Sequence, residues 1–339
     1  MQIDWNKVSR VLVVRLRSIG DTVLATPSLI ALKRFLPEAR VDILLEDWVA
    51  PVLEGFDAVD NILTVGRSAR SRLKAARKIR SAGYEVVFNL HGGTTSTFFV
   101  RASGAPHRVG FSGYRYSFLY NHRTASPLEF WNAKKAHSAE QQLALLGAVG
   151  VPVGDRPKSR LAVTETALEK LSSKIKIWES KIALLHPAAA FDTKQWAAEN
   201  FARVAAFLHE KNFEIVAVAT KKERAVLEDL QKFSSVPVKI FDDLTLPEIT
   251  ALASAARIFV GNDSGIAHIA AAVQTPSVVI FGSSNRDHWR PWTDAPHRIV
   301  FQELACQPCA GHFCKEFSEP ECIKRVSVEQ VIEALETLL

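Results

Sequence analysis

The residues best suited to chemistry lie at positions 257–272. The apolar run 258–260 is followed by the polar turn 261–265 and then by small, apolar residues. This order predicts a buried strand, a tight turn and a helix. Backbone N–H groups at a helix start lack helical partners and carry partial positive charge, so they suit an anion such as a phosphate. Asp263 or Ser264 could instead act only as a helix N-cap, with nothing bound.

Three further residues could act with this turn. Asp21 follows the first predicted strand, where a carboxylate serves either as a general base or as a helix cap. Lys194 lies in the loop after another predicted strand, and it either holds a phosphate or is merely solvated. His268 lies four residues after Ser264, about one helical turn away on the same face. It could reach the same phosphate, or it could be a core histidine bonded to a backbone carbonyl.

Basic side chains gather in two stretches of the first half. Four of them crowd the start of a predicted helix, and these are Arg67, Arg70, Arg72 and Lys74. Four more accompany the irregular region that follows, namely Arg101, Arg108, Arg115 and Arg123. Arginine binds carboxylates and phosphates with two parallel hydrogen bonds, so these residues could grip an anionic acceptor. The alternative is a solvated basic face.

All four cysteines fall late in the chain. Cys306, Cys309, Cys314 and Cys322 are separated by two, four and seven residues, and His312 lies among them. A compact set of four thiols could hold a structural zinc ion. Unbound thiols and conditional disulfides are the alternatives, and nothing in the pattern makes the cluster catalytic.

The order of predicted elements indicates an α/β protein with two domains. Apolar strand runs recur between helical patterns, at 11–15, 41–45, 61–65, 85–90, 181–186, 213–219, 236–240, 258–260 and 277–281. This alternation predicts parallel sheets, in which ligands bind at the carboxyl ends of the strands. Asp21 and His91 both lie at such ends. The Gly- and Pro-rich stretch 150–157 places the domain boundary after residue 155.

Composition limits the class of protein. The 339 residues carry a formal net charge of +6 and a pI near 9.1, which suits an acidic small ligand or an anionic membrane surface. No window approaches the roughly 18 uninterrupted apolar residues of a spanning helix, and no secretory signal begins the chain. We therefore expect a cytoplasmic protein. No nucleic-acid-binding module is visible, and no Gly-x-Gly-x-x-Gly follows the first strand, which argues against a dinucleotide-dependent oxidoreductase.

Three motifs, in order along the chain, resemble one known family. They are Ser-Ile-Gly-Asp-Thr-Val-Leu-Ala-Thr-Pro at 18–27, Lys-Gln-Trp at 194–196, and the stretch 261–272 followed by Val-Ile-Phe-Gly at 279–282. Together they are similar to glycosyltransferase family 9, the lipopolysaccharide heptosyltransferases. The resemblance implies a GT-B fold, in which two Rossmann-like domains with parallel sheets face a central cleft. It also implies transfer of heptose from ADP-L-glycero-D-manno-heptose to the lipopolysaccharide inner core, with inversion and with no required metal or other cofactor.

The resemblance divides the work between the two domains. It assigns the acceptor to the N-terminal domain, 1–155, and the nucleotide-sugar to the C-terminal domain, 156–326. In such folds the last helix, here 327–339, often packs back on the first domain. The acceptor would be Kdo–lipid A or a heptosyl acceptor, which is an anionic lipopolysaccharide core. We therefore expect peripheral attachment to the cytoplasmic face of the inner membrane.

The resemblance also gives roles to individual residues. Asp21 matches the proposed catalytic base, which removes a proton from the acceptor hydroxyl. Lys194 and the backbone N–H groups of Ser264 and Gly265 would hold the diphosphate. Asp263 would contact the sugar hydroxyls, His268 a phosphate, and Glu223 the ribose. A helix terminus and a lysine can stabilise charge on a leaving diphosphate without a metal.

The loop after Gly282 departs from the family pattern. The family often continues with Pro-Thr, whereas Ser283, Ser284 and Asn285 follow here. That loop lies near the nucleotide in the family, so a different donor, such as a UDP-hexosamine, remains open. A non-catalytic nucleotide-sugar-binding protein is the alternative of another class.

Overall fold

The computed structural model describes residues 2–176, 180–309 and 311–339. The chain forms two compact units, Met1–Ala162 and Val163–Leu339. Each unit contains one six-stranded sheet whose paired strands run parallel. The predicted α/β class with parallel sheets is therefore confirmed. The sequence placed the boundary after residue 155, whereas the first unit continues to residue 162.

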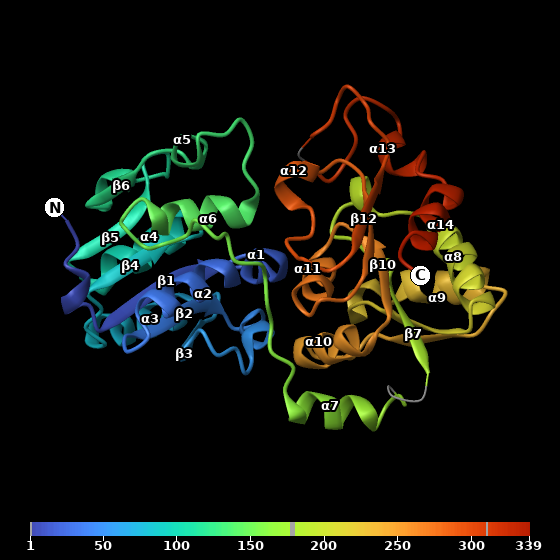
Figure 1. Ribbon diagram of the computed structural model, residues 1–339, viewed down its shortest axis with the longest axis horizontal. Helices are drawn as coiled ribbons and strands as arrows, with labels where there is room; N and C mark the ends of the chain where they lie inside the picture. Colours follow the sequence, from blue (N-terminus) through green and yellow to red (C-terminus); the bar gives the residue numbers. More distant parts are fainter. Residues whose placement is uncertain (1, 177–179, 310) are drawn as a thin grey trace. The chain divides into compact units, whose positions relative to one another are not determined.

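The first unit has the strand order β3-β2-β1-β4-β5-β6 (Figure 1). Its strands are β1 (Arg10–Leu16), β2 (Arg40–Glu46), β3 (Asn61–Val65), β4 (Val86–Asn89), β5 (His107–Phe111) and β6 (His122–Thr124). Its α-helices are α1 (Ile19–Val23), α2 (Thr26–Phe35), α3 (Ala69–Ser81), α4 (Thr94–Ser103), α5 (Pro127–Trp131) and α6 (Ser138–Gly147). Short 3₁₀ turns lie at η1 (Trp5–Lys7), η2 (Ala50–Leu53) and η3 (Ser117–Leu119).

Alternation along β1 builds the core of the first unit. Leu12, Val14 and Leu16 belong to one apolar cluster with residues of α3 and α4. Successive side chains of a strand point to opposite faces, so Val11 and Val13 face the other side of the sheet. They are buried as well, which is the pattern of a parallel sheet covered by helices on both faces.

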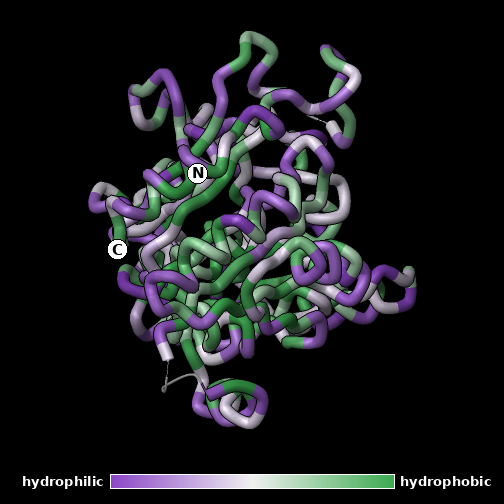
Figure 2. The backbone as a smooth tube through the Cα atoms, turned by 90° about the vertical axis from the view of Figure 1, so that its right-hand side faces the viewer, coloured by the Kyte–Doolittle hydropathy of each residue, from purple (hydrophilic) through white to green (hydrophobic). Residues whose placement is uncertain are grey.

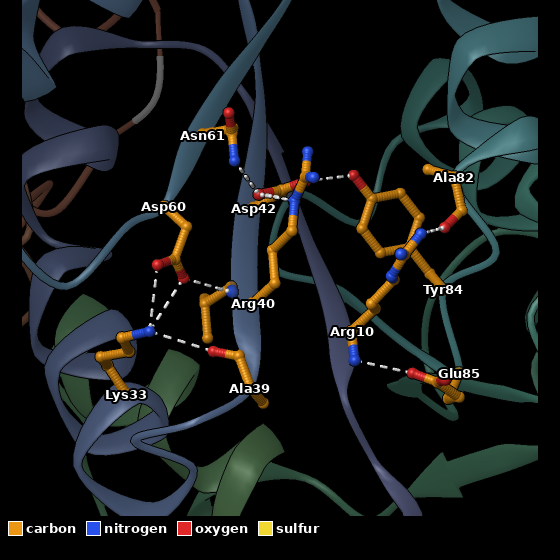
Figure 3. Close-up of polar contacts among 11 residues, drawn as sticks. Arg10, Lys33, Ala39, Arg40, Asp42, Asp60, Asn61, Ala82, Tyr84 and Glu85 are labelled. Atoms are coloured by element: carbon orange, nitrogen blue, oxygen red, sulfur yellow. Dashed lines mark hydrogen bonds and ion pairs between the residues drawn. The ribbon is translucent and has the colours of Figure 1, made fainter.

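A polar network joins the amino ends of neighbouring strands in the first unit (Figure 3). Asp42 of β2 is fully buried, and it accepts hydrogen bonds from Arg40 Nε at 2.9 Å, Asn61 Nδ2 at 3.1 Å and the Tyr84 hydroxyl at 2.5 Å. Burial, together with this carboxylate, raises the pKa of Tyr84 and keeps the phenol protonated as a donor. The network stabilises the end of the sheet opposite to the carboxyl ends of its strands.

The second unit has the strand order β12-β11-β10-β7-β8-β9. Its strands are β7 (Lys181–His186), β8 (Phe213–Val218), β9 (Val238–Phe241), β10 (Ile258–Asn262), β11 (Ser277–Phe281) and β12 (His297–Phe301). Its α-helices are α7 (Glu165–Ser172), α8 (Ala198–Glu210), α9 (Arg224–Phe233), α10 (Leu246–Ala255), α11 (Gly265–Ala272), α12 (Arg286–Trp289), α13 (Glu321–Lys324) and α14 (Val328–Glu336). The 3₁₀ turns are η4 (Asp192–Lys194) and η5 (Lys221–Glu223).

The last helix, α14, belongs to the second unit. Val328, Val331 and Leu335 recur at helical spacing on one face and lie in the apolar cluster that α8, α9 and the second sheet form. The resemblance suggested that residues 327–339 pack on the first domain, whereas the structure assigns them to the second unit. The apolar stripe of α14 is used inside the core of its own unit.

Several elements differ from the sequence prediction. Strands β5, β6 and β12 were missed, because they are short and mix charged residues with apolar ones. The apolar pattern of residues 22–36 predicts one helix, whereas the chain forms α1 and α2 there. Pro27 lies in the first turn of α2, where its missing N–H is least costly. The sequence Ser138-x-x-Gln141 has the form of a capping box, but helix α6 is capped one residue earlier, by His137 with Glu140.

Hydropathy follows this architecture. Along the tube of Figure 2, hydrophobic stretches alternate with hydrophilic ones. The amphipathic pattern of residues 164–179 predicts one helix. Helix α7 ends at Ser172, and residues 177–179 lie outside the described part of the chain. Within the described residues, no helix is long and apolar enough to cross a membrane.

Candidate functional site

Both sheets have the same strand order. Numbered from the first strand of each unit, both read 3-2-1-4-5-6, which is the Rossmann order. Ligands of such sheets bind outside the carboxyl ends of the strands, where the strand order reverses. That point lies between β1 and β4 in the first unit, and between β7 and β10 in the second. Asp21, His91, Lys194 and Asp263 follow these four strands in turn.

In the second unit, the N-terminus of α11 is not capped by its own serine. Ser264 is the N-cap residue, but its side chain makes no capping hydrogen bond. The serine or threonine N-caps of α7, α10 and α14 in the same unit all accept a backbone N–H, at 3.3, 3.4 and 3.2 Å. The side chain of Ser264 therefore leaves the first amides of α11, including that of Gly265, open to an external acceptor.

The hydroxyl of Ser264 is directed to His186 instead. Ser264 Oγ lies 3.1 Å from His186 Nδ1, at the end of β7. His186 is paired in register with Gly261 of β10. A Cβ added at Gly261 would lie 3.1 Å from the carbonyl oxygen of His186 and closer still to the ring of Phe259. The missing side chain of Gly261 thus permits this close strand packing.

His186 is held as a neutral imidazole. Burial lowers its pKa to about 4, and the opposing influence of the Glu223 carboxylate is smaller. A neutral ring has one nitrogen that can accept a hydrogen bond, so it can accept one from the hydroxyl of Ser264. Glu223 was predicted to hold a ribose. Its electrostatic effect on the pKa of His186 indicates that it lies near the end of β7.

Lys194 and Asp263 form an ion pair beside the start of α11. Lys194 Nζ lies 2.8 Å from Asp263 Oδ2, and Ser284 Oγ donates to the same oxygen at 2.5 Å. The Asp263 side chain is 5% exposed and that of Lys194 is 21% exposed. The carboxylate is therefore well shielded, while the ammonium group retains access to solvent.

Two sets of contacts hold the loops that carry this pair. Asn262 Oδ1 accepts the N–H of Trp196 at 3.1 Å, and Asn262 Nδ2 donates to the carbonyl of Pro187 at 2.8 Å. A Cβ at Gly282 would lie only 2.1 Å from the carbonyl oxygen of Thr193, so glycine is required where these loops meet. Lys194 therefore sits on a loop that is fixed on both sides.

The remaining predicted donor residues have other surroundings. His268 is buried on α11, one turn beyond Ser264. Glu223 completes a capping box, in which its Oε2 accepts the N–H and the hydroxyl of Thr220 at 3.0 and 2.7 Å. One carboxylate oxygen of Glu223 is thus used locally, and the role of either residue toward a ligand stays a prediction.

In the first unit, Asp21 is both a cap and a member of a charged cluster. It completes a capping box with Ser18, whose hydroxyl lies 3.1 Å from Asp21 Oδ2, and its Oδ1 forms an ion pair with Arg15. Arg15 is buried and also donates to the carbonyl of Leu90. Burial, with the nearby positive charge of Arg15, lowers the pKa of His91, so its ring is neutral at pH 7.

The basic residues predicted for an acceptor begin at the carboxyl end of β3. Arg67, Arg70, Arg72 and Lys74 are all exposed. Arg67 follows β3 and Asp21 follows β1, and these strands are two positions apart in the sheet. The carboxyl ends of parallel strands all lie at the same end of the sheet, so both residues are found at that end. Their role toward an acceptor stays a prediction.

The four cysteines are free thiols. Burial raises the pKa of Cys309, and it raises that of Cys322 to about 11, with further contributions from the neighbouring cysteines. Among the described residues, no three His, Cys, Asp or Glu side chains are grouped so that they could hold a metal ion. The zinc hypothesis therefore stays a prediction, which metal analysis of the purified protein tests.

Three residues of these sites escaped the sequence analysis: Arg15, His186 and Ser284. Arg15 and His186 are polar residues close to the ends of otherwise apolar strands, which is a signal that the sequence does contain. Ser284 was noted only as a departure from the family pattern. Its contact with Asp263 depends on the fold, because the two residues follow different strands.

Two sheets in the Rossmann order define an α/β protein with two Rossmann-like domains. Known structures agree with this class. A glycosyl transferase family 9 structure from Veillonella parvula has a TM-score of 0.84 at 21% identity, covering 100% of this chain and 98% of that one. The structure of Escherichia coli ADP-heptose LPS heptosyltransferase II has a TM-score of 0.81 at 21% identity, covering 97% and 98%. The expected GT-B fold class is thereby confirmed.

Sequence comparison identifies the family. The model of glycosyltransferase family 9 (heptosyltransferase) matches residues 72–318, so the chain belongs to this family and is a glycosyltransferase. Lipopolysaccharide heptosyltransferase 3 of Escherichia coli K12 is 26% identical, with 96% of each chain covered. Lipooligosaccharide heptosyltransferase 2 of Campylobacter jejuni is 25% identical, with 95% of each chain covered.

Proposed function

We propose that the protein transfers heptose from ADP-heptose to the inner core of lipopolysaccharide. Family membership and the names of the full-length relatives support this activity. The observation that carries the proposal is the open N-terminus of α11 beside the ammonium group of Lys194. Backbone donors and one cation together suit the diphosphate of a nucleotide-sugar.

In this proposal the second unit binds the donor. The amides of Ser264 and Gly265 and the side chain of Lys194 hold the diphosphate, and Asp263 keeps Lys194 in position. Asp263 Oδ1 makes no contact with Lys194 or Ser284, both of which bind Oδ2, so it is available to a sugar hydroxyl. His268 and Glu223 complete the donor contacts, to a phosphate and the ribose respectively.

The first unit supplies the base. An acceptor hydroxyl gives its proton to the carboxylate of Asp21, and its oxygen forms a bond with the anomeric carbon of heptose. The bond from that carbon to the diphosphate breaks, the electron pair leaves with ADP, and the configuration inverts. Arg15 orients the carboxylate. Charge on the leaving diphosphate is stabilised by Lys194 and α11, so this scheme uses no metal. It requires that the two units bring base and donor together.

The acceptor is lipid-linked in this proposal, so the protein works as a peripheral protein at the cytoplasmic face of the inner membrane. The first unit has a suitable exposed segment at 115–135. Large apolar side chains are exposed there, namely Tyr116, Phe118, Leu128 and Phe130. Exposed basic residues lie among them, namely Arg115, Arg123, Lys134 and Lys135. Aromatic rings with basic neighbours suit an anionic bilayer surface.

Vesicle sedimentation tests this attachment. Phe118 is 72% exposed, and Phe118→Asp should weaken binding to phosphatidylglycerol vesicles. The matched control is Phe233→Asp in the second unit, since Phe233 is 44% exposed and lies outside this segment. Equal binding by the two variants would remove the segment from the membrane contact.

A panel of ADP-, UDP- and GDP-sugars tests the donor. ADP-heptose should stabilise the protein in a thermal-shift assay and be turned over with a lipopolysaccharide-core acceptor. Selective stabilisation by a UDP-hexosamine would replace the proposed donor. Binding of ADP-heptose without turnover, for any inner-core acceptor, would support a nucleotide-sugar-binding protein instead.

A further inference from the structure

The contact between His186 and Ser264 has a consequence for donor binding. We infer that His186 is a positioning residue, which holds the hydroxyl of Ser264 away from the amides of α11 and so keeps them free for the diphosphate. This inference rests on the proposed function, because it takes a nucleoside diphosphate as the ligand of α11. It gives His186 a role in binding without a contact to the donor.

The geometry offers Ser264 two competing partners. A serine at the N-cap position normally accepts the N–H of the second or third helical residue, here Ile266 or Ala267. In this structure the serine makes no such bond, and its Oγ lies 3.1 Å from His186 Nδ1. The backbone of Ser264 is extended, with φ −150° and ψ 170°. Its position is thus that of an N-cap, while its side chain is engaged elsewhere.

Capping by Ser264 and binding of a phosphate exclude each other. Both need the lone N–H groups of the first turn of α11. A cap that forms in the free protein must be broken before the ligand binds. The free energy of binding is therefore less favourable by the free energy of that cap. A serine cap typically stabilises a helix by about 1 kcal/mol, which corresponds to about a fivefold change in a dissociation constant.

The burial of His186 favours its hydrogen bond with Ser264. The residue is 6% exposed, at the end of a central strand, and its ring is neutral. A neutral acceptor in a buried position needs a donor, because an unsatisfied polar group there is costly. Ser264 is the donor that the fold supplies. The competing explanation is that His186 only fills space in the core.

A double-mutant cycle separates these explanations. The variants are His186→Phe, Ser264→Ala and their combination, and calorimetry measures the dissociation constant of ADP. His186→Phe should weaken ADP binding by about fivefold, because Ser264 is then released to cap α11. Adding Ser264→Ala to His186→Phe should restore about fivefold, because no hydroxyl remains to compete. A residue that only fills space would give no restoration.

Two further variants complete the design. His186→Asn retains an acceptor for Ser264 and should bind ADP more tightly than His186→Phe. His209→Phe, at an exposed position of α8, is the matched control and should leave ADP affinity unchanged. If Asn behaves as Phe does, the hydrogen bond to Ser264 is not the cause and the inference is wrong.

The same cycle followed by unfolding needs no ligand. In the His186→Phe background, Ser264→Ala should remove a cap. The equilibrium ratio of folded to unfolded protein should then fall by about fivefold. The wild-type background is not the comparison, because there Ser264→Ala removes the hydrogen bond to His186 instead of a cap. No decrease in the His186→Phe background would overturn the inference, because Ser264 would then form no cap even when His186 is absent. This result is independent of ADP, so failure of wild-type protein to bind ADP would count against the proposed function alone.

Discussion

Replacing Lys194 with methionine tests the anion site most directly. The substitution keeps the length of the side chain and removes the charge that lies 2.8 Å from Asp263. A charge-assisted hydrogen bond contributes about 1.5–3 kcal/mol. We therefore expect ADP affinity to fall by about 2 kcal/mol, which is about 30-fold in the dissociation constant.

The same substitution leaves the Asp263 carboxylate with fewer partners. That side chain is 5% exposed and keeps its bond from Ser284. We expect a loss of about 1 kcal/mol in the free energy of unfolding, at the low end for a buried group that loses one partner. The remaining negative charge should also repel the diphosphate. Adding Asp263→Asn should therefore restore part of the lost ADP affinity, roughly tenfold if the effective dielectric is about 20.

Calorimetry with ADP, which has no heptose, isolates this effect from contacts between Asp263 and the sugar. Lys170→Met is the matched control, because Lys170 is an exposed lysine on α7 of the same unit. An unchanged dissociation constant for Lys194→Met would remove Lys194 from the anion site. A double variant weaker than the single one would show that Asp263 attracts the ligand rather than repelling it.

Asp21, His186 and the cysteines each give a further prediction. Asp21→Asn should abolish transfer while ADP still binds, with Asp155→Asn, a surface ion-pair residue, as the control; measurable turnover would reduce Asp21 to a cap. The pKa of His186 is lowered to about 4 in the folded protein, so the unfolded chain binds more protons than the folded one between about pH 4 and 6.5. The free energy of unfolding therefore falls as the pH falls through this range. Wild type should lose about 2 kcal/mol more than His186→Asn between pH 7.5 and 5 in urea unfolding, and parallel losses would contradict this. At pH 8, iodoacetamide should label exposed Cys309 before buried Cys322, whose pKa is raised to about 11; stoichiometric zinc in purified protein would contradict free thiols, because bound cysteines are deprotonated.

Strand runs of the sheet interiors were predictable from the sequence because they are continuous and apolar. The predicted strands 181–186 and 277–281 coincide with the interior strands β7 and β11. Such strands are buried on both faces, so their local composition matches their environment. β12 was missed because a short strand beside only one neighbour needs few apolar residues, and its sequence His-Arg-Ile-Val-Phe is mixed.

The family resemblance implied two Rossmann-like domains, but the strand order of each sheet could not be read from the local sequence. No short repeat is detectable, yet the two sheets share one strand order. Strand order depends on which apolar strands pair across crossovers, and many different sequences satisfy the same pairing. Only the tertiary structure therefore locates both reversal points, and with them the strand ends where ligands bind.

The sequence by itself determined the family, the α/β class and the types of residue at the candidate site. Motif order was sufficient because Asp21, Lys194 and Ser264 each follow a predicted strand at a local turn. Only the tertiary structure decided how those groups are engaged: Asp21 with Arg15, Lys194 with Asp263, and Ser264 with His186. The reason is physical. Each contact except the first joins residues more than 60 positions apart, and its partner is chosen by strand pairing rather than by local sequence.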